Sequence, residues 1–278
     1  MLTLLQLKQY REIPYNYTSF SDKEIVYRFL GIDAWTLLES LRTNRNTGRS
    51  ARMLFEVLGD MWVVDRNPYL QEDLIKNQRR WKSLIEALNS RLDLVRKRAN
   101  NNSKVLELLH SADLAVAKFE LCLSDFKQHK KRIKQALLKV TSNNNIRFDA
   151  LSRSAHATDA TDWRVEYPQV VITPDTELEI AAIVKACIEL GLTIIPRGGG
   201  TGYTGGAIPL HAQTAVINTE KLSFIDNIKS ANNLQSVNVG AGVITKRVSE
   251  LATENNLVFA VDPTSQDACT IGGNVAMN

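Results

Sequence analysis

The pattern of apolar positions divides the chain into two parts of different class. From residue 71 to 140 there is neither glycine nor proline, and apolar residues recur at steps of three and four, as on one helix face. The pattern predicts two long amphipathic helices that are broken near residues 100–102 and pack antiparallel as a hairpin. Shorter helical stretches come first, among them residues 50–58, which we expect Gly59 to end.

In the second half of the chain, short apolar runs separated by turn residues replace the helical pattern. The runs that predict strands are 170–172, 192–196, 215–217 and 236–239. Thr176 and Glu179 form a capping box at the start of a helix that Gly191 ends. We predict an α+β fold for residues 151–278, following an all-helical domain of unknown function in residues 1–150.

Charge and glycine content change at the same place. Residues 1–150 hold 26 Lys and Arg against 17 Asp and Glu, a net charge of +9, whereas residues 151–278 hold 8 against 13, a net charge of −5. Eleven of the 14 glycines lie in the second part. Both shifts favour a domain boundary near residue 150. Because the basic clusters of the first part alternate with acidic residues and accompany no binding motif, we expect solvated helix faces and no nucleic-acid partner.

The sequence does not indicate a membrane-spanning helix, a metal site or a set of disulfides. No apolar run approaches the ~18 residues that a membrane-spanning helix needs. Cys122, Cys187 and Cys269 are odd in number and far apart, so they form neither a metal-spaced pair nor a disulfide framework. We expect no metal site and a cytoplasmic location, with peripheral attachment to the inner membrane as an open alternative.

A glycine-rich segment directly after an apolar run is the main candidate for a binding site. Six of the ten residues from Arg197 to Gly206 are glycine, which lets backbone N–H groups turn toward one point and hold a phosphate or pyrophosphate. We expect positive φ or close backbone approach at Gly199 and Gly202. A flexible linker is the alternative, but a linker of this composition rarely follows an apolar strand. The residues assigned to the site are Pro196, Arg197, Gly198, Gly199, Gly200, Thr201, Gly202, Tyr203, Thr204, Gly205 and Gly206.

The same segment also fits the dinucleotide pattern G-x-G-x-x-G from Gly200 to Gly205, and Glu220 follows at about the spacing of a ribose-binding acid. A Rossmann fold requires a helix to begin at the last glycine. Here Pro209 follows closely, and proline does not fit a helix interior. We therefore expect the pyrophosphate to lie on loop amides and not on a helix end.

A second informative segment runs from Val261 to Asn278 and reads V-D-P-T-S-Q-D-A-C-T-I-G-G-N-V-A-M-N. Its paired glycines, Gly272 and Gly273, permit close approach of the backbone to a ligand. Because the sequence stops within this motif, we expect the chain to be a fragment of a longer protein.

Together the motifs P-R-G-G-G-T-G-Y-T-G-G and D-P-T-S-Q-D-A-C-T-I-G-G-N-V-A-M-N resemble the FAD-linked oxidases of the vanillyl-alcohol oxidase and p-cresol methylhydroxylase type. The nearest resemblance is to D-lactate dehydrogenases and the flavin subunit of glycolate oxidase. The resemblance covers about residues 150–278. It includes Asp159–Asp162, which precedes Tyr167–Val171 and is similar to the segment that leads into this domain in the family; we call this segment the lead-in. Residues Arg11–Phe20 are similar to an uncharacterised N-terminal domain of large bacterial versions of these flavoproteins.

The resemblance implies two small α+β subdomains that hold FAD between them, with the glycine-rich loop around the pyrophosphate. Some relatives attach FAD covalently through a histidine at the position of Thr201, and none of the four histidines of this chain lies there, so we expect non-covalent FAD. These histidines are His110, His129, His156 and His211. The residues that the resemblance assigns to the flavin side are Asp262, Pro263, Thr264, Ser265, Thr270, Ile271, Gly272, Gly273 and Asn274.

The implied activity is oxidation of a small-molecule D-2-hydroxy acid of the D-lactate or glycolate type, with electrons passed to a quinone or another acceptor. The family's substrate-binding cap domain is not contained in these residues, so catalytic residues stay unassigned and this piece alone is expected to be inactive. Two alternatives remain open. One is an FAD-dependent reductase of the cell-wall sugar-nucleotide type, which the D-P-T-S-Q run disfavours. The other is an inactive helical interaction module, which flavin absorbance would exclude.

Overall fold

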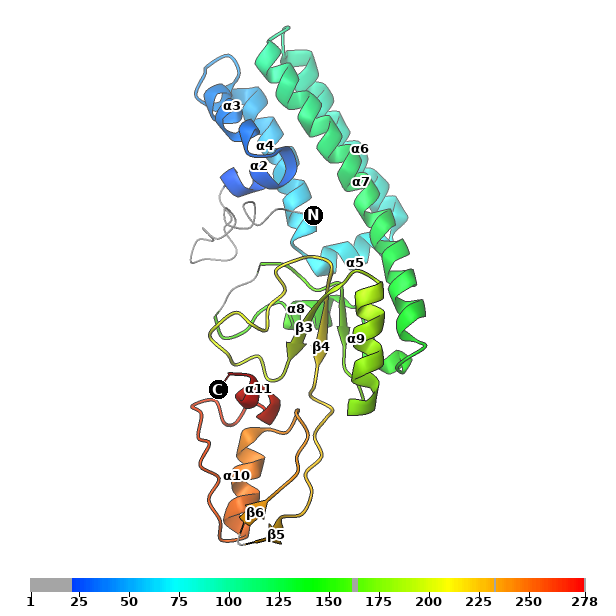
Figure 1. Cartoon of the computed structure of the whole chain (residues 1–278). Helices are drawn as coiled ribbons and strands as arrows, with labels where there is room; N and C mark the ends of the chain where they lie inside the picture. The colour runs from blue at the N-terminus through cyan, green and yellow to red at the C-terminus, as the bar shows by residue number, and fades with distance from the viewer. Residues whose placement is uncertain (1–21, 162–164, 233, 278) are drawn as a thin grey trace. The chain divides into compact units, whose positions relative to one another are not determined.

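The computed structural model describes residues 22–161, 165–232 and 234–277 (Figure 1). The chain divides into two compact units, and the boundary in the sequence lies between His129 and Lys130. Two stretches used in the sequence comparison, Arg11–Phe20 and the end of the lead-in at Asp162, lie outside the described residues.

The first unit is helical, as predicted. Its helices are α2 (Asp22–Leu30), α3 (Asp33–Arg42), α4 (Gly48–Asp65), α5 (Pro68–Lys76), α6 (Gln78–Arg98) and α7 (Ser103–Leu137), the last of which continues into the second unit. The ring of Trp81 on α6 lies 5.3 Å from that of Phe119 on α7, and Arg96 forms an ion pair of 2.8 Å with Asp113. These contacts pair the start of α6 with the later part of α7, so the predicted antiparallel hairpin is confirmed.

Helix α4 does not end at Gly59, and the predicted end there is wrong. The helix continues to Asp65, with Leu58 and Met61 fully buried on either side of the glycine. Glycine inside a helix costs about 1 kcal/mol. Burying a large apolar side chain contributes roughly 1.5–3 kcal/mol, so the packing of these two side chains outweighs the local preference.

The second unit is built around a mixed sheet (Figure 1). Its elements are η1 (Asn143–Asn145), β1 (Ile146–Arg147), α8 (Ala150–Ala155), β2 (Val170–Ile172), η2 (Glu177–Glu179), α9 (Ile180–Glu189), β3 (Thr193–Arg197), β4 (Thr214–Asn218), β5 (Lys229–Ala231), β6 (Leu234–Ser236), α10 (Thr245–Glu254) and α11 (Ile271–Met277). The order is β1-β2-β4-β3, with β2, β4 and β3 parallel and β1 antiparallel to β2. Strands β5 and β6 form a separate hairpin.

The sheet has apolar residues buried on both faces, as parallel strands usually do. Val170 and Ile172 of β2 belong to the same buried cluster as Ile183 of α9 and Leu137 at the end of α7, while Val171 between them is buried as well. Residues 130–150 therefore pack with the sheet. The compositional change near residue 150 lies beyond the packing boundary at His129 and Lys130, and a domain boundary near 150 stays a prediction.

Three predicted strands, 170–172, 192–196 and 215–217, match β2, β3 and β4 within a residue or two. The capping box is confirmed, with the backbone N–H of Thr176 donating to Glu179 Oε1 at 3.1 Å, and Gly191 ends α9 at φ 71°. The run 236–239 is only partly a strand, because β6 ends at Ser236 and Val239 forms an isolated bridge to Ile225.

Candidate cofactor-binding site

The glycine-rich loop is the connection between two neighbouring parallel strands. It leaves the carboxyl end of β3 and reaches β4 through residues 198–213 without a helix, which confirms that the segment is not a Rossmann fingerprint. In sheets with parallel strands, ligands bind beyond the carboxyl ends of the strands. Gly200 and Gly205 have φ of 67° and 71°, a region that favours glycine, so positive φ occurs at these positions and not at Gly199 or Gly202.

The backbone N–H groups of this loop are unused. In the parts of the chain that the structure describes, none of the amides of residues 199–206 donates a hydrogen bond to another protein group. Unpaired amides are uncommon in folded chains unless they face water or a ligand. Successive free donors around glycines with positive φ form the kind of concave surface that binds anions.

The second motif, in contrast, donates backbone hydrogen bonds to the segment that precedes α10. The backbone N–H groups of Ile271 and Gly272 each donate over 2.9 Å, to the carbonyls of Val243 and Ala241 respectively. A Cβ on Gly272 would lie 2.9 Å from the Cβ of Ala241, so glycine is required there by packing against the protein. A contact of Gly272 with a ligand stays a prediction.

The structure brings the two motifs together. A Cβ on Gly198 would lie 2.2 Å from Thr270 Oγ1, and a Cβ on Gly199 would lie 2.1 Å from the carbonyl oxygen of Ala268. Gly198 and Gly199 are therefore needed for the first loop to pass directly over the second motif.

An open cavity of about 400 Å³ lies at the meeting point of three segments. Its lining residues are Thr158, Asp159, Ala160, Arg197, Gly200, Thr201, Tyr203 and Ser265. Five of them were assigned to the site from the sequence. Residues Thr158–Ala160 were not, although Asp159 and Ala160 belong to the lead-in of the family pattern. Neither Asp262 nor Asn274 lines this cavity, and Asn274 Nδ2 instead donates to Thr245 Oγ1 at 2.6 Å.

Arg197 ties these segments to one another. Its Nη1 donates to the carbonyl of Thr158 at 2.7 Å and to that of Ala207 at 3.2 Å, and Nη2 reaches the carbonyl of Ala155 at 3.5 Å. Burial lowers the pKa of the guanidinium, and the neighbouring charge of Asp159 opposes that shift. Because these donors are already used by protein carbonyls, Arg197 positions the loop, and an anion there would be held by amides.

Asp159 supplies an unused acceptor in the cavity wall. Its Oδ1 accepts a hydrogen bond from the backbone N–H of Thr161 at 2.9 Å. Its Oδ2 is buried and has no hydrogen-bond partner among the described residues. A buried acceptor without a donor is costly. Because this oxygen is closed off from solvent, a hydroxyl or amino group of a ligand would reach it only if the wall moved.

His156 holds the lead-in against the sheet and was not recognised from the sequence. Its Nδ1 lies 2.8 Å from the carbonyl of Ser152, and its Nε2 lies 2.9 Å from Asn218 Nδ2 at the end of β4. Nδ1 therefore carries the proton and Nε2 accepts from Asn218, which is the arrangement of a neutral ring. Burial lowers the pKa of His156, a hydrogen bond to Ser152 opposes that shift, and the charge of Arg197 adds to it.

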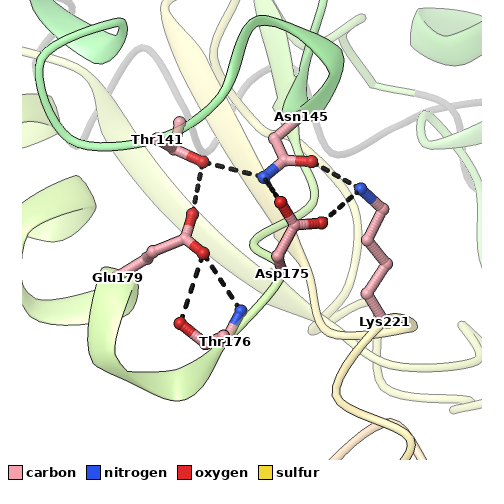
Figure 2. A network of polar contacts seen from close by, with 6 residues as sticks. All are labelled: Thr141, Asn145, Asp175, Thr176, Glu179 and Lys221. Carbon is pink, nitrogen blue, oxygen red and sulfur yellow. Dashed lines mark hydrogen bonds and ion pairs between the residues drawn. The ribbon is translucent and has the colours of Figure 1, made fainter.

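A network of polar side chains fixes the turn that follows β4 (Figure 2). The side chains drawn there are Thr141, Asn145, Asp175, Thr176, Glu179 and Lys221. Lys221 Nζ donates to Asp175 Oδ1 at 2.7 Å, and the fully buried Asn145 donates to Asp175 Oδ2 at 2.9 Å. Hydrogen bonds from Lys221 and Asn145 lower the pKa of Asp175. In the same turn the backbone N–H of Thr219 donates to the carbonyl of Arg197 at 2.9 Å, so the network supports the stem of the glycine-rich loop.

The described residues provide neither a metal site nor a membrane-spanning helix. Within the described ranges, no group of three or more His, Cys, Asp or Glu side chains could hold a metal ion. No described helix combines the length and the apolar character that crossing a membrane requires.

Comparison with known proteins identifies both parts of the chain. Residues 168–278 match the family described as FAD binding domain, and residues 8–121 match a family described as protein of unknown function (DUF3683). Glycolate oxidase subunit GlcD of Escherichia coli strain K12 is 35% identical over 111 residues, which are 40% of this chain and 22% of that protein. D-lactate dehydrogenase of Archaeoglobus fulgidus is 36% identical over 109 residues, which are 39% and 24%.

The chain thus spans about a quarter of the length of these two relatives. Among solved structures, p-cresol methylhydroxylase with substrate bound aligns with a TM-score of 0.45 and 19% identity, covering 53% of this chain and 29% of that one. The chain therefore carries an FAD binding domain in residues 168–278, and a domain of unknown function precedes it in residues 8–121.

Proposed function

We propose that this chain binds FAD non-covalently and serves an oxidoreductase that oxidises a D-2-hydroxy acid. The observation that carries the proposal is the row of unused backbone amides in residues 199–206, at the carboxyl end of β3 and inside the matched family region. Such a row binds a pyrophosphate without any cationic side chain.

The residues around the cavity fit FAD. The unused amides of the loop, which border the cavity, are suited to its pyrophosphate. Thr201 lines the cavity at the position where some relatives have a covalently linked histidine, which supports non-covalent binding. When bound, the flavin supplies the acceptor for hydride, and the chain's own residues bind and orient it.

The proposed substrate class rests on the two similar proteins described above. One is a glycolate oxidase subunit and the other a D-lactate dehydrogenase, and glycolate and D-lactate are both 2-hydroxy acids. We propose that the electrons pass to a quinone or another acceptor, and the catalytic residues stay unassigned. We also propose a cytoplasmic location, where the unpaired cysteines would stay reduced.

Replacing Gly202 with valine tests the cofactor site directly. A Cβ at Gly202 would meet no protein atom within 4 Å, and its φ is not positive, so the substitution adds bulk only toward solvent or a ligand. We expect FAD affinity to fall by at least about tenfold while the melting temperature stays unchanged, because the loop's close approach to the pyrophosphate is lost. Quenching of flavin fluorescence during a titration measures the affinity.

The matched control is Gly59→Val in α4, since a Cβ there also meets no atom within 4 Å apart from its own helix. Gly48 is a poorer control, because a Cβ on it would lie 3.0 Å from the carbonyl oxygen of Arg42. Equal FAD affinity in wild type and Gly202→Val would show that this loop is not the FAD site. The substrate class is tested separately, by adding D-lactate or glycolate to the flavin-loaded protein that contains this chain and following the loss of flavin absorbance.

We also propose that the chain folds as two domains, and limited proteolysis locates their boundary. A first cleavage between Thr141 and Ser154 would place it where composition changes. A first cleavage close to His129 would place it at the packing boundary, because Ile146 and Phe148 are buried in the core of the second unit. Cleavage first within residues 71–120 would contradict both positions.

A further inference from the structure

Two adjoining cavities lie at the start of α4 in the first unit, far in sequence from the FAD binding domain. Their volumes are about 400 and 640 Å³, and Gly48 and Arg52 line both of them. The charged residues around the pair are Arg42, Arg45, Arg49, Arg52 and Arg98, with Asp22 and Glu56. We refer to the two together as the arginine cavity.

Most of the positive charge in the arginine cavity is not neutralised by the protein. Asp22 is already paired with Arg42 at 3.2 Å. Arg45, Arg49 and Arg52 have neither an ion pair nor a hydrogen bond from their side chains to any described residue. Among the described residues, the Arg98 side chain donates a hydrogen bond only to Met53 Sδ, at 3.3 Å. Of the described lining residues, Glu56 is the one carboxylate that remains for these four guanidinium groups.

Several arginines elsewhere in the same unit have carboxylate partners. Arg28 pairs with Asp65 at 2.7 Å, and Arg80 pairs with Asp73 at 2.5 Å. In addition, the first turn of α4 contains no acidic residue. The guanidinium groups of Arg45, Arg49, Arg52 and Arg98 are exposed to water, which weakens their mutual repulsion, and an anion in the cavity would be attracted by all four.

We propose that the arginine cavity binds a small organic phosphate. Guanidinium groups match phosphate oxygens in bidentate geometry, which favours phosphate over a simple point charge. Each of the two volumes falls within the range of roughly 300–1,000 Å³ that small-molecule sites occupy, which is more than a free phosphate ion needs. Phe55, Met53 and Leu94 also line it and supply apolar surface for the organic part.

The test uses inorganic pyrophosphate as probe and the double variant Arg49→Ala/Arg52→Ala of the whole chain. Calorimetric titration should show pyrophosphate affinity at this site reduced on the order of 100-fold, because two charge-assisted contacts are lost. The matched control is Arg79→Ala/Lys82→Ala on α6, which removes the same charge from exposed positions outside the cavity and should leave the affinity within about twofold.

The glycine-rich loop is a second place where pyrophosphate could bind, so Gly202→Val is titrated in parallel. Binding that survives Gly202→Val and is lost in Arg49→Ala/Arg52→Ala supports the arginine cavity, whatever the outcome for FAD. Pyrophosphate binding that Gly202→Val abolishes completely, or that the α6 control weakens equally, would overturn the proposal.

A further experiment distinguishes a free phosphorylated metabolite from the phosphate headgroup of a lipid. Tight binding of glycerol 3-phosphate in solution supports a free metabolite, and co-sedimentation with phosphatidate vesicles that the arginine double variant abolishes supports a lipid headgroup. Binding of single-stranded DNA with steep salt dependence, without measurable binding of either phosphate, would overturn a small-molecule site and indicate a nucleic acid.

Discussion

Gly200 and Gly272 lie in neighbouring segments of one site, yet each is glycine for a different reason. Gly200 has φ of 67° in a loop whose amides are not used by the protein. Gly272 lies in a segment whose amides are hydrogen-bonded, and its missing Cβ makes room for Ala241. We therefore propose that the first loop faces a ligand, whereas the second motif supports the loop. Substitutions in the two segments should separate cofactor affinity from stability.

The largest expected effect on binding comes from Gly200→Val. Valine at positive φ is strained, and strain of this kind costs of order 1–3 kcal/mol. Its Cβ would also lie 2.3 Å from Arg197 Nη2 and displace the side chain that holds the loop. We expect FAD affinity to drop on the order of 100-fold, since both effects distort the amide row. Fluorescence titration measures it, and an affinity within twofold of wild type would remove the distinction between the segments.

The corresponding change in the second motif, Gly272→Val, should act on stability. Its side chain would collide with Ala241, and overpacking of this kind costs typically 1–3 kcal/mol. We expect a lower melting temperature of the second unit with FAD affinity changed less than twofold at a temperature where the variant is folded. A variant of normal stability that fails to bind FAD would show that the second motif also faces the ligand.

The smallest expected effect is a pH dependence that arises from His156. Its folded pKa is lowered by burial, while in the unfolded chain it is about 6.5. The unfolded state therefore binds more protons as pH falls below that value, and the stability of the second unit decreases there and is constant above it. Thermal denaturation of wild type and His156→Gln between pH 5 and 8, a range chosen about the ordinary histidine pKa, measures the difference. Identical slopes would assign the acid sensitivity to other groups.

Much of the fold follows from local sequence patterns, whereas parts of the site do not. The hairpin of α6 and α7 and the strands β2, β3 and β4 were predictable because periodicity and turn residues are local signals. The continuation of α4 through Gly59 depends on the burial of Leu58 and Met61, which a local pattern does not show.

The glycine-rich loop was predictable as an irregular segment with positive φ because its composition alone indicates how the backbone can bend, and its role as a binding site stays a prediction. The wall formed by Thr158, Asp159 and Ala160 was not predictable, because Arg197 joins it to the loop across 39 positions of the sequence. His156 was overlooked for the same reason, since its contact with Asn218 spans 62 positions.

The three carbonyls bound by Arg197 also have a consequence for how this site opens. Two of them, Ala155 at the end of α8 and Thr158, directly precede the lead-in, and Ala207 belongs to the connection between β3 and β4. Neither segment can leave the other without releasing the same guanidinium. The two segments should therefore fluctuate as one cooperative unit, so that their amides exchange hydrogen with solvent in a common opening event, and a cofactor that holds one segment slows exchange in both.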